Sequence, residues 1–245
     1  MTPAATATLQ RRTVEPSALG LKRVELLLGL PDTALEALAR ECRWRRYAAD
    51  ERIISRDAHD NDVYLIVSGR VRVTCFSAAG REVVFGDMRA GQCFGDFAAI
   101  DGLSRSADVV AIDDSLIASM TPEVFKHMLH QHVEVCDRVL RRLVNSIREL
   151  TERVYDFSTL GVQNRVHAEL LRLAREAGVT RNTARIDPVP RHSDIAAQIS
   201  TYREQVTREL SAMAKQGLVK RDGGALVVPD IARLERIVAD VRRSV

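Results

Sequence analysis

The stretch RHSDIAAQISTYREQVTREL, which runs from Arg191 to Leu210, decides how the C-terminal third of the chain folds. It contains two helical patterns with a tight break between them. Each pattern has apolar residues at helical spacing, and these are Ile195, Ala196, Ile199, Val206, Leu210 and Met213. Because apolar residues at this spacing share one face of a helix, the stretch predicts two short helices packed together as a helix-turn-helix.

The polar side of the second helix has side chains suited to reading DNA. Arginines such as Arg203 and Arg208 can each donate two hydrogen bonds to guanine, and Glu204 can accept one from cytosine or hold a neighbouring arginine. The alternative is a helical pair whose charges face water. Two further features favour DNA binding. The segment GLVKRDGGALVVP (217–229) predicts a hairpin that turns at Asp222-Gly223-Gly224, as in a DNA-binding wing. Residues 158–245 have 15 basic and 10 acidic side chains.

The segment from Trp44 to about Met120 is typical of strands. Short β-branched runs alternate with Gly, Asp, Ser and Asn, and AAG at 78–80 predicts a hairpin tip. Six or more such runs predict an antiparallel barrel or roll. Two helices are expected before it, in ALGLKRVELLLGL (18–30) and in PDTALEALAREC (31–42), where Pro31 and Asp32 open the second one.

Within the strands lies GQCFGDFAAIDGLSRSADVV (Gly91 to Val110), which has the features of a phosphate-binding segment. Gly95 permits a sharp turn, and the following FAAI can form a short helix with free N–H groups. Arg105 offers a planar fork suited to a phosphodiester, and Ser106 adds a hydroxyl. Asp96 can accept a hydrogen bond from a ribose hydroxyl, as acidic residues do in dinucleotide sites. The alternative is a plain turn with a surface arginine.

After the strands, Thr121 and Pro122 predict the start of a long helix. Apolar residues then recur at alternating steps of four and three, with charged residues between them. We call this stripe the seam, and its members are Cys136, Leu140, Leu143, Ile147, Leu150 and Val154. Such a narrow stripe predicts a parallel homodimer, whereas the alternative is a helix packed on its own domain.

Composition and spacing argue against several other classes. No run of about 18 apolar residues is present, and the N-terminus lacks the apolar core of a signal peptide, so we expect a cytoplasmic protein. The four cysteines and six histidines have no clear metal-binding spacing. No nucleophile–base arrangement indicates catalysis, and no ligand pair indicates haem. We therefore expect no metal, no iron–sulfur cluster, no haem and no enzymatic activity.

The order of these features resembles the Crp/Fnr family of bacterial transcription regulators over about residues 19–230. FGDFAAIDGLSRSA is similar to the family's cyclic-nucleotide cassette, and REQVTR (Arg203 to Arg208) is similar to the recognition helix of the branch that reads TGTGA-like half-sites. The resemblance implies cAMP or cGMP as allosteric ligand, double-stranded DNA and RNA polymerase as partners, and a homodimer. A ligand-independent regulator and a regulatory subunit of a partner enzyme are the alternatives.

The resemblance also assigns residues. The expected ligand-binding residues are Val73, Met88, Gly95, Asp96, Phe97, Ala98, Arg105, Ser106, Leu150 and Thr151. The expected DNA-binding residues are His192, Ser193, Thr201, Tyr202, Arg203, Glu204, Thr207 and Arg208.

Three departures from the family pattern are visible. Asp96 replaces the usual Glu, Leu150-Thr151 replaces a Thr-Ser pair that contacts the purine, and Ser200 and Tyr202 replace the Gly and Ser of the turn. Thr201 is expected to cap the recognition helix instead.

The predicted fold class is therefore α+β. Its expected parts are a disordered arm (1–17), an antiparallel β-roll (jelly-roll-like) that binds a cyclic nucleotide (18–121), a dimerisation helix (122–157) and a winged helix-turn-helix domain (158–245).

Overall fold

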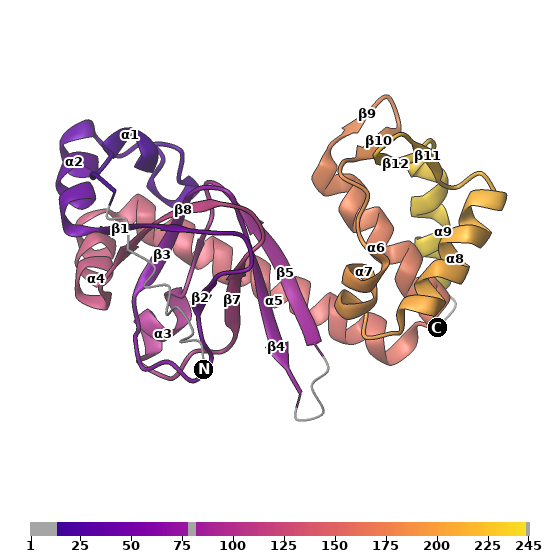
Figure 1. Cartoon of the computed structure of the whole chain (residues 1–245), viewed down its shortest axis with the longest axis horizontal. Coiled ribbons are helices and arrows are strands. Elements are labelled where there is room, and N and C mark those ends of the chain that lie inside the picture. Colours follow the sequence, from indigo (N-terminus) through magenta and orange to yellow (C-terminus); the bar gives the residue numbers. More distant parts are fainter. Residues whose placement is uncertain (1–13, 78–81, 244–245) are drawn as a thin grey trace, which may run out of the picture. The chain divides into compact units, whose positions relative to one another are not determined.

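The computed structural model describes residues 14–77 and 82–243 (Figure 1). Most of the predicted arm and the predicted hairpin tip at 78–80 lie outside these residues. The chain forms two compact units, and the division falls between Arg142 and Leu143. Glu82, Val83 and Val84 belong with the second unit.

The first unit begins with short helices rather than with the first of the two expected full helices. After α1 (Ala18–Leu21) comes a 3-10 turn, η1 (Glu25–Leu27), and then α2 (Asp32–Glu41). The expectation of one helix across 18–30 is wrong. Leu21, Val24 and Leu27 are all fully buried, and their spacing of three suits a tighter turn than an α-helix.

Eight strands follow, and all the pairings between them that are described are antiparallel. They form two four-stranded sheets, with orders β1-β8-β3-β6 and β2-β7-β4-β5. The strands are β1 (Arg43–Tyr47), β2 (Arg52–Ile54), β3 (Val63–Ser68), β4 (Arg70–Phe76), β5 (Glu82–Arg89), β6 (Cys93–Phe94), β7 (Asp108–Ala111) and β8 (Ser115–Met120). The predicted antiparallel roll is confirmed.

The two sheets share one apolar core. Ile66 and Ile117 come from the first sheet and Val71 and Val109 from the second, and all four belong to one cluster of buried side chains. The short helix α3 (Asp96–Asp101) interrupts the strand order between β6 and β7. The chain that carries the expected phosphate-binding segment is therefore anchored at both ends by strands.

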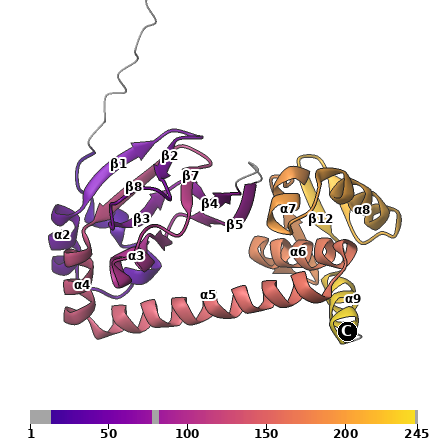
Figure 2. The ribbon, with the colours of Figure 1, turned by 90° about the horizontal axis from the view of Figure 1, so that it is seen from below.

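The expected long helix from Pro122 is in fact two helices (Figure 2). α4 (Pro122–Gln131) has Pro122 at its start, and the Thr121 hydroxyl accepts from the N–H of Val124, as the sequence predicts. His132 then adopts an extended conformation and ends α4, and α5 (Val133–Thr159) continues for 27 residues. The single helix expected over 122–157 is therefore wrong, and α5 is the part that contains the seam.

The second unit is a winged helix-turn-helix. Its sheet has the order β11-β12-β10-β9, and its core unites apolar residues of helices α6 to α9 with those of the sheet. The elements are α6 (Val162–Ala177), β9 (Val179–Thr180), β10 (Thr183–Ile186), α7 (His192–Gln198), α8 (Arg203–Lys215), β11 (Lys220–Asp222), β12 (Ala225–Val228) and α9 (Ile231–Arg243). Gly223 has a φ of 58° between β11 and β12, which explains the glycine in the predicted wing turn.

Candidate functional site

A glycine shapes the turn before α3. Gly95 has a φ of 83° and stands at the N-cap of the helix. A Cβ atom there would lie 2.7 Å from both Nη1 of Arg105 and the backbone oxygen of Asp62. Only glycine fits at this position. The positive φ disfavours other residues, and the neighbouring atoms leave no space for a Cβ atom. The turn therefore brings the main chain directly against the guanidinium of Arg105.

Arg105 is buried and held on several sides. Its Nη1 donates to the carbonyl of Gly95 at 3.0 Å, and its Nη2 donates to the carbonyl of Asp62 at 2.8 Å. The carboxylate of Asp60 accepts from Nε and Nη2 at 3.3 Å, and the ring of Tyr64 lies 5.5 Å below the guanidinium carbon. These contacts fix the plane of the guanidinium. A fixed cation of this kind is suited to an anionic ligand group.

Tyr64 supports this arrangement from the core. Its hydroxyl donates to Asp60, and its ring stacks on Phe94 at 5.1 Å between centroids. Burial, and then the hydrogen bond to Asp60, raise the pKa of Tyr64. The phenol therefore stays protonated and remains a donor. Asp60, Asp62 and Tyr64 were not among the predicted site residues, because their contacts with Arg105 cross more than 40 positions of the sequence.

Asp96 forms the second polar group of the site. It is 3% exposed, and its carboxylate accepts from the guanidinium of Arg142 on α5. Burial of Arg142 opposes its charge, but nearby negative groups, Asp96 among them, outweigh this effect and raise its pKa. The sequence shows Arg142 only as one of the charges beside the seam. Its link to Asp96 joins the cassette to α5.

A cavity of about 120 Å³ lies between these groups. The residues that line it include eight of the ten predicted ligand-binding residues: Val73, Met88, Gly95, Asp96, Phe97, Ala98, Arg105 and Ser106. The others are Ile54, Phe94, Ala107, Val109 and Arg142. The cavity therefore combines an apolar wall with one cation and one ion pair. Ligand pockets commonly measure about 300–1,000 Å³, so a nucleotide requires some widening.

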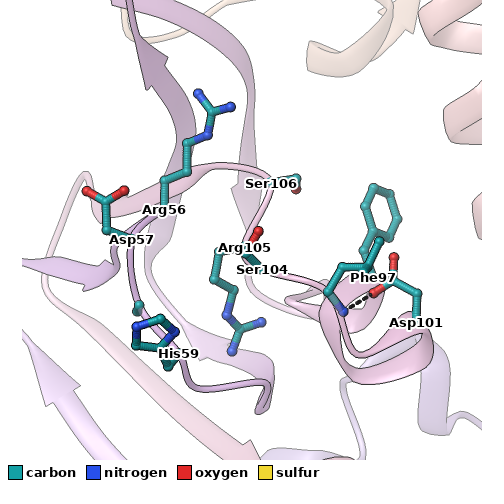
Figure 3. Close-up of a pocket in the computed structure, with 10 residues that line it drawn as sticks. Arg56, Asp57, His59, Phe97, Asp101, Ser104, Arg105 and Ser106 are labelled. Atoms are coloured by element: carbon teal, nitrogen blue, oxygen red, sulfur yellow. Dashed lines mark hydrogen bonds between the residues drawn. The ribbon is translucent and has the colours of Figure 1, made fainter.

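A larger hollow of about 710 Å³ adjoins the cavity and shares Phe97, Arg105 and Ser106 with it. Figure 3 shows Arg105 between the loop that carries His59 and the helix that carries Phe97 and Asp101. Arg105 therefore lines both the cavity and the larger hollow.

Leu150 and Thr151 are not among the described residues that line the cavity. Thr151 follows Arg142 by nine residues, which places it about half a turn away around α5. Its hydroxyl donates to the carbonyl of Ile147 at 2.8 Å, and its side chain is exposed. A role for Leu150 and Thr151 in ligand binding therefore stays a prediction that requires the dimer.

The helix-turn-helix is formed by α7 and α8. Ile195 and Ala196 on α7 are buried, as are Val206 and Met213 on α8. Ser200, between the two helices, has a φ of 52°, a left-handed conformation that favours glycine. This accounts for the glycine of the family pattern at the same place.

The opposite face of α8 is exposed. Arg203, Glu204, Thr207 and Arg208 lie on it, and Tyr202 before the helix is 67% exposed. Because these positions repeat at helical spacing, their side chains share one surface. This surface contains five of the eight predicted DNA-binding residues.

His192 and Thr201 are placed differently. Nδ1 of His192 lies 2.7 Å from the hydroxyl oxygen of Thr207, and burial, then Arg221 and Arg203, lower its pKa. His192 begins α7 beside the exposed Ser193. The expectation that Thr201 caps α8 is wrong, because Tyr202 is the N-cap residue and no side chain caps it. Thr201 is buried and its hydroxyl contacts Gln205 instead.

The seam on α5 is largely uncovered in the single chain. Cys136 and Leu143 are half-buried, whereas Leu140, Ile147, Leu150 and Val154 are between 49% and 64% exposed. An apolar stripe of this size is unusual on the surface of a monomer. It is suited to the same stripe of a second copy.

Among the described residues, no group of three or more His, Cys, Asp or Glu side chains is placed to hold a metal ion. In the same part of the chain, no helix is both long and apolar enough to cross a membrane. The four cysteines lie within these residues and are free.

Comparison with known proteins gives consistent matches. A family model for a cyclic nucleotide-binding domain matches residues 44–132, and one for a Crp-like helix-turn-helix domain matches residues 164–237. The CRP-like cAMP-activated global transcriptional regulator of Mycobacterium tuberculosis is 24% identical over 217 residues, which are 88% of this chain and 97% of that protein. The cyclic AMP receptor protein of Thermus thermophilus is 29% identical over 177 residues, or 71% and 78% of the two chains.

A solved structure of a CooA variant from Carboxydothermus hydrogenoformans shares the fold. Its TM-score is 0.75 at 18% identity, and the match covers 93% of this chain and 98% of that one. A β-roll with a cyclic-nucleotide-binding cassette, joined to a winged helix-turn-helix, defines a ligand-gated DNA-binding regulator. The two family models together match about two thirds of the chain. The chain belongs to the Crp/Fnr family, whose members are transcription regulators and not enzymes.

Proposed function

We propose that the β-roll binds one cyclic nucleotide, with cAMP preferred over cGMP, and that binding controls how the chain reads DNA. The cavity between Arg105 and Asp96 carries this proposal, because it provides a fixed cation, a polar pair and an apolar wall in one place. In this proposal the cation binds the phosphodiester of the ligand, the polar pair binds its ribose, and the apolar wall covers its base. The names of the two relatives above, both of which refer to cAMP, support the preference.

In this proposal the residues have separate roles. Arg105 and Ser106 bind the phosphate, and Asp96 accepts from the ribose 2′-hydroxyl after exchanging part of its contact with Arg142. Val73 and Met88 cover the base. Since Arg142 belongs to α5, the ligand changes the contacts of this helix. A ligand shifts the regulator toward the DNA-binding arrangement only if it binds that arrangement more tightly.

DNA recognition follows from the dimer. Crp family regulators are dimeric, and we place the interface of this one along the α5 seam. Two copies then present their α8 helices to successive major grooves, about 34 Å apart, on a palindromic site with TGTGA-like half-sites. Arg203, Glu204 and Arg208 read bases. RNA polymerase is the proposed further partner at the promoter.

Calorimetric titration with cAMP and with cGMP tests the ligand, and fluorescence anisotropy with a palindromic duplex tests the gating. We expect both nucleotides to bind, with affinities within about 100-fold of each other, or under roughly 3 kcal/mol. We expect cAMP to tighten DNA binding more than cGMP does. Stronger activation by cGMP would reverse the preference, and DNA binding that neither nucleotide changes would show a ligand-independent regulator.

A further inference from the structure

His192 and Thr207 form a chain of hydrogen bonds beside the exposed face of α8. His192 begins α7, and its Nδ1 lies 2.7 Å from the hydroxyl oxygen of Thr207 on α8. That hydroxyl donates its proton to the carbonyl of Arg203 at 3.0 Å. A hydroxyl has only one proton, so Thr207 accepts from His192, and Nδ1 is the donor. The contact therefore assigns the proton of the neutral imidazole to Nδ1.

The other ring nitrogen of His192, Nε2, is the one that can change its state. In the neutral ring Nε2 has a lone pair and accepts hydrogen bonds, whereas in the imidazolium it is a donor. Protonation of Nε2 leaves the bond to Thr207 in place, because Nδ1 donates in both forms. The ring can therefore gain a positive charge without breaking the contact between α7 and α8.

The surroundings of His192 keep the imidazole of the free protein neutral at neutral pH. Burial, and then the positive charges of Arg221 on β11 and Arg203 on α8, lower the pKa of His192. Its charged neighbours along the chain are Arg191 and Asp194. Since the ordinary pKa of histidine is about 6.5, a lowered pKa leaves the ring uncharged at about pH 7. Arginines on two other elements of the domain therefore oppose the proton.

A phosphate group of DNA reverses this balance. The exposed charged side chains on α8 and β11 beside His192 include those of Arg203, Arg208, Arg221 and Glu204. A phosphate bound among these arginines brings a negative charge to the ring, and a nearby opposite charge favours the protonated form of a histidine. The imidazolium can then donate from Nε2 to a phosphate oxygen. A neutral ring offers the anion only a lone pair at Nε2.

We propose that His192 is a pH-dependent contact to a DNA phosphate, in which Nε2 takes up a proton from the solvent when DNA binds, so that DNA binding tightens as the pH falls. The proposal rests on the function proposed above. Affinity rises as the pH falls through the raised pKa of His192 in the complex. It levels off below the lower pKa of the free protein, where both states are protonated. Above the pKa of the complex the ring is neutral in both states and adds nothing to the pH dependence.

The test measures the affinity of the full-length protein for a palindromic duplex with TGTGA half-sites. Anisotropy at constant salt and saturating cAMP compares about pH 6 with about pH 8, on either side of the ordinary pKa of histidine. The variants are His192→Gln, His192→Arg and, as the control, His127→Gln, which changes an exposed histidine of α4.

Between the two pH values, the affinity of the wild type should rise at least about fivefold more than that of His192→Gln, since each proton taken up contributes up to about tenfold per pH unit. His192→Arg stays charged at both pH values. It should therefore lose the pH dependence and bind more tightly than the wild type at the higher pH. His127→Gln should follow the wild type.

Salt dependence separates a phosphate contact from a base contact. Each phosphate contact adds about 0.9 to the slope of log affinity against log salt concentration. The slope of the wild type should be steeper at the lower pH by about this amount per subunit, on cognate and random duplexes alike. The slope of His192→Gln should change less with pH. A pH effect of His192 that is confined to the cognate duplex would identify a base contact and overturn the phosphate assignment.

The outcomes separate this inference from the proposed function. If the wild type binds the duplex and His192→Gln shows the same pH dependence, the role of His192 is wrong. If His192→Gln weakens binding equally at both pH values, its role is structural and the inference is also wrong. Thermal melting checks folding, and if His192→Gln does not fold, the pH dependence of His192→Arg decides. If the wild type does not bind the duplex at either pH, the proposed function fails and this inference fails with it.

Discussion

The cavity of the β-roll and the recognition surface of α8 present their polar side chains in opposite ways. In the cavity, Arg105 and Asp96 are almost fully buried, and each has partners from distant parts of the sequence. On α8, Arg203 and Arg208 lie on an exposed face, and their placement follows from helical spacing alone. A ligand in the cavity must therefore displace existing contacts of Arg105 and Asp96. DNA can contact the exposed face of α8 without displacing such contacts.

This difference suggests where control and where readout lie. In the proposed mechanism, the ligand exchanges the contact between Asp96 and Arg142 and so changes the packing of α5, which ties ligand binding to conformation. Substitution of a residue on an exposed helix face changes the affinity for DNA without changing the fold of the protein. The residues of this face are therefore expected to set base preference. The following four predictions sharpen this comparison or contradict it, and they run from the largest expected effect to the smallest.

The largest effect is expected from the seam that links the two regions. Leu143→Glu combined with Ile147→Glu places like charges against one another across the proposed dimer. We expect monomers by sedimentation, and a loss of specific DNA affinity of at least about 100-fold, because the two half-sites are no longer bound together. Asn145→Glu, exposed on the same helix but outside the seam, is the control and should leave the dimer intact. A double variant that remains dimeric would contradict the seam.

The next effect concerns the buried cation. Arg105→Ala removes charge-assisted hydrogen bonds to the ligand phosphate, each worth about 1.5–3 kcal/mol. Calorimetry should show at least a roughly tenfold loss of cAMP affinity. Arg40→Ala, which changes an exposed arginine of α2 that lines neither the cavity nor the hollow, is the control and should change affinity little. Unchanged affinity of Arg105→Ala would show that the phosphate binds elsewhere.

On the exposed face, Arg203→Ala and Arg208→Ala should each cost about 1–3 kcal/mol on the cognate site and relax base preference at one position. Anisotropy with single-base variants of the duplex measures this. Lys220→Ala in the wing is the comparison, and it should weaken all sequences alike, as expected for a phosphate contact. Equal losses on cognate and random DNA for both arginine variants would identify them as phosphate contacts too.

The smallest effect is expected at Thr151, which lies outside the described cavity lining. Thr151→Ala should reduce the response of DNA binding to cAMP by roughly two- to fivefold. Affinity for cAMP itself should change less, because the Arg105 and Asp96 contacts remain. Parallel titrations of the wild type and the variant measure both quantities. Full activation of the variant by cAMP would remove Thr151 from the mechanism.

Some parts of the fold could be predicted because they depend on neighbours in the sequence. Thr121 and Pro122 start α4 through local capping, and Asp222, Gly223 and Gly224 turn the wing through local backbone preference. Other parts could not. The segment before Pro31 forms separate turns that bury Leu21, Leu26, Leu27 and Leu30, and an extended His132 divides the expected long helix. In the first of these segments, tertiary packing overrides local helix propensity.

The sequence by itself determined the order of the β-roll, cassette, long helix and winged helix-turn-helix. It also predicted that Arg203 and Arg208 lie on the polar face of a helix, and it predicted most of the residues that line the cavity. Both predictions were possible because periodicity and turn residues are local properties. Only the tertiary structure decided that Asp60, Asp62 and Tyr64 hold Arg105, and that Arg142 meets Asp96. The physical reason is that a buried charge needs acceptors or an opposite charge close in space, and the folded chain supplies these from any distance along the sequence.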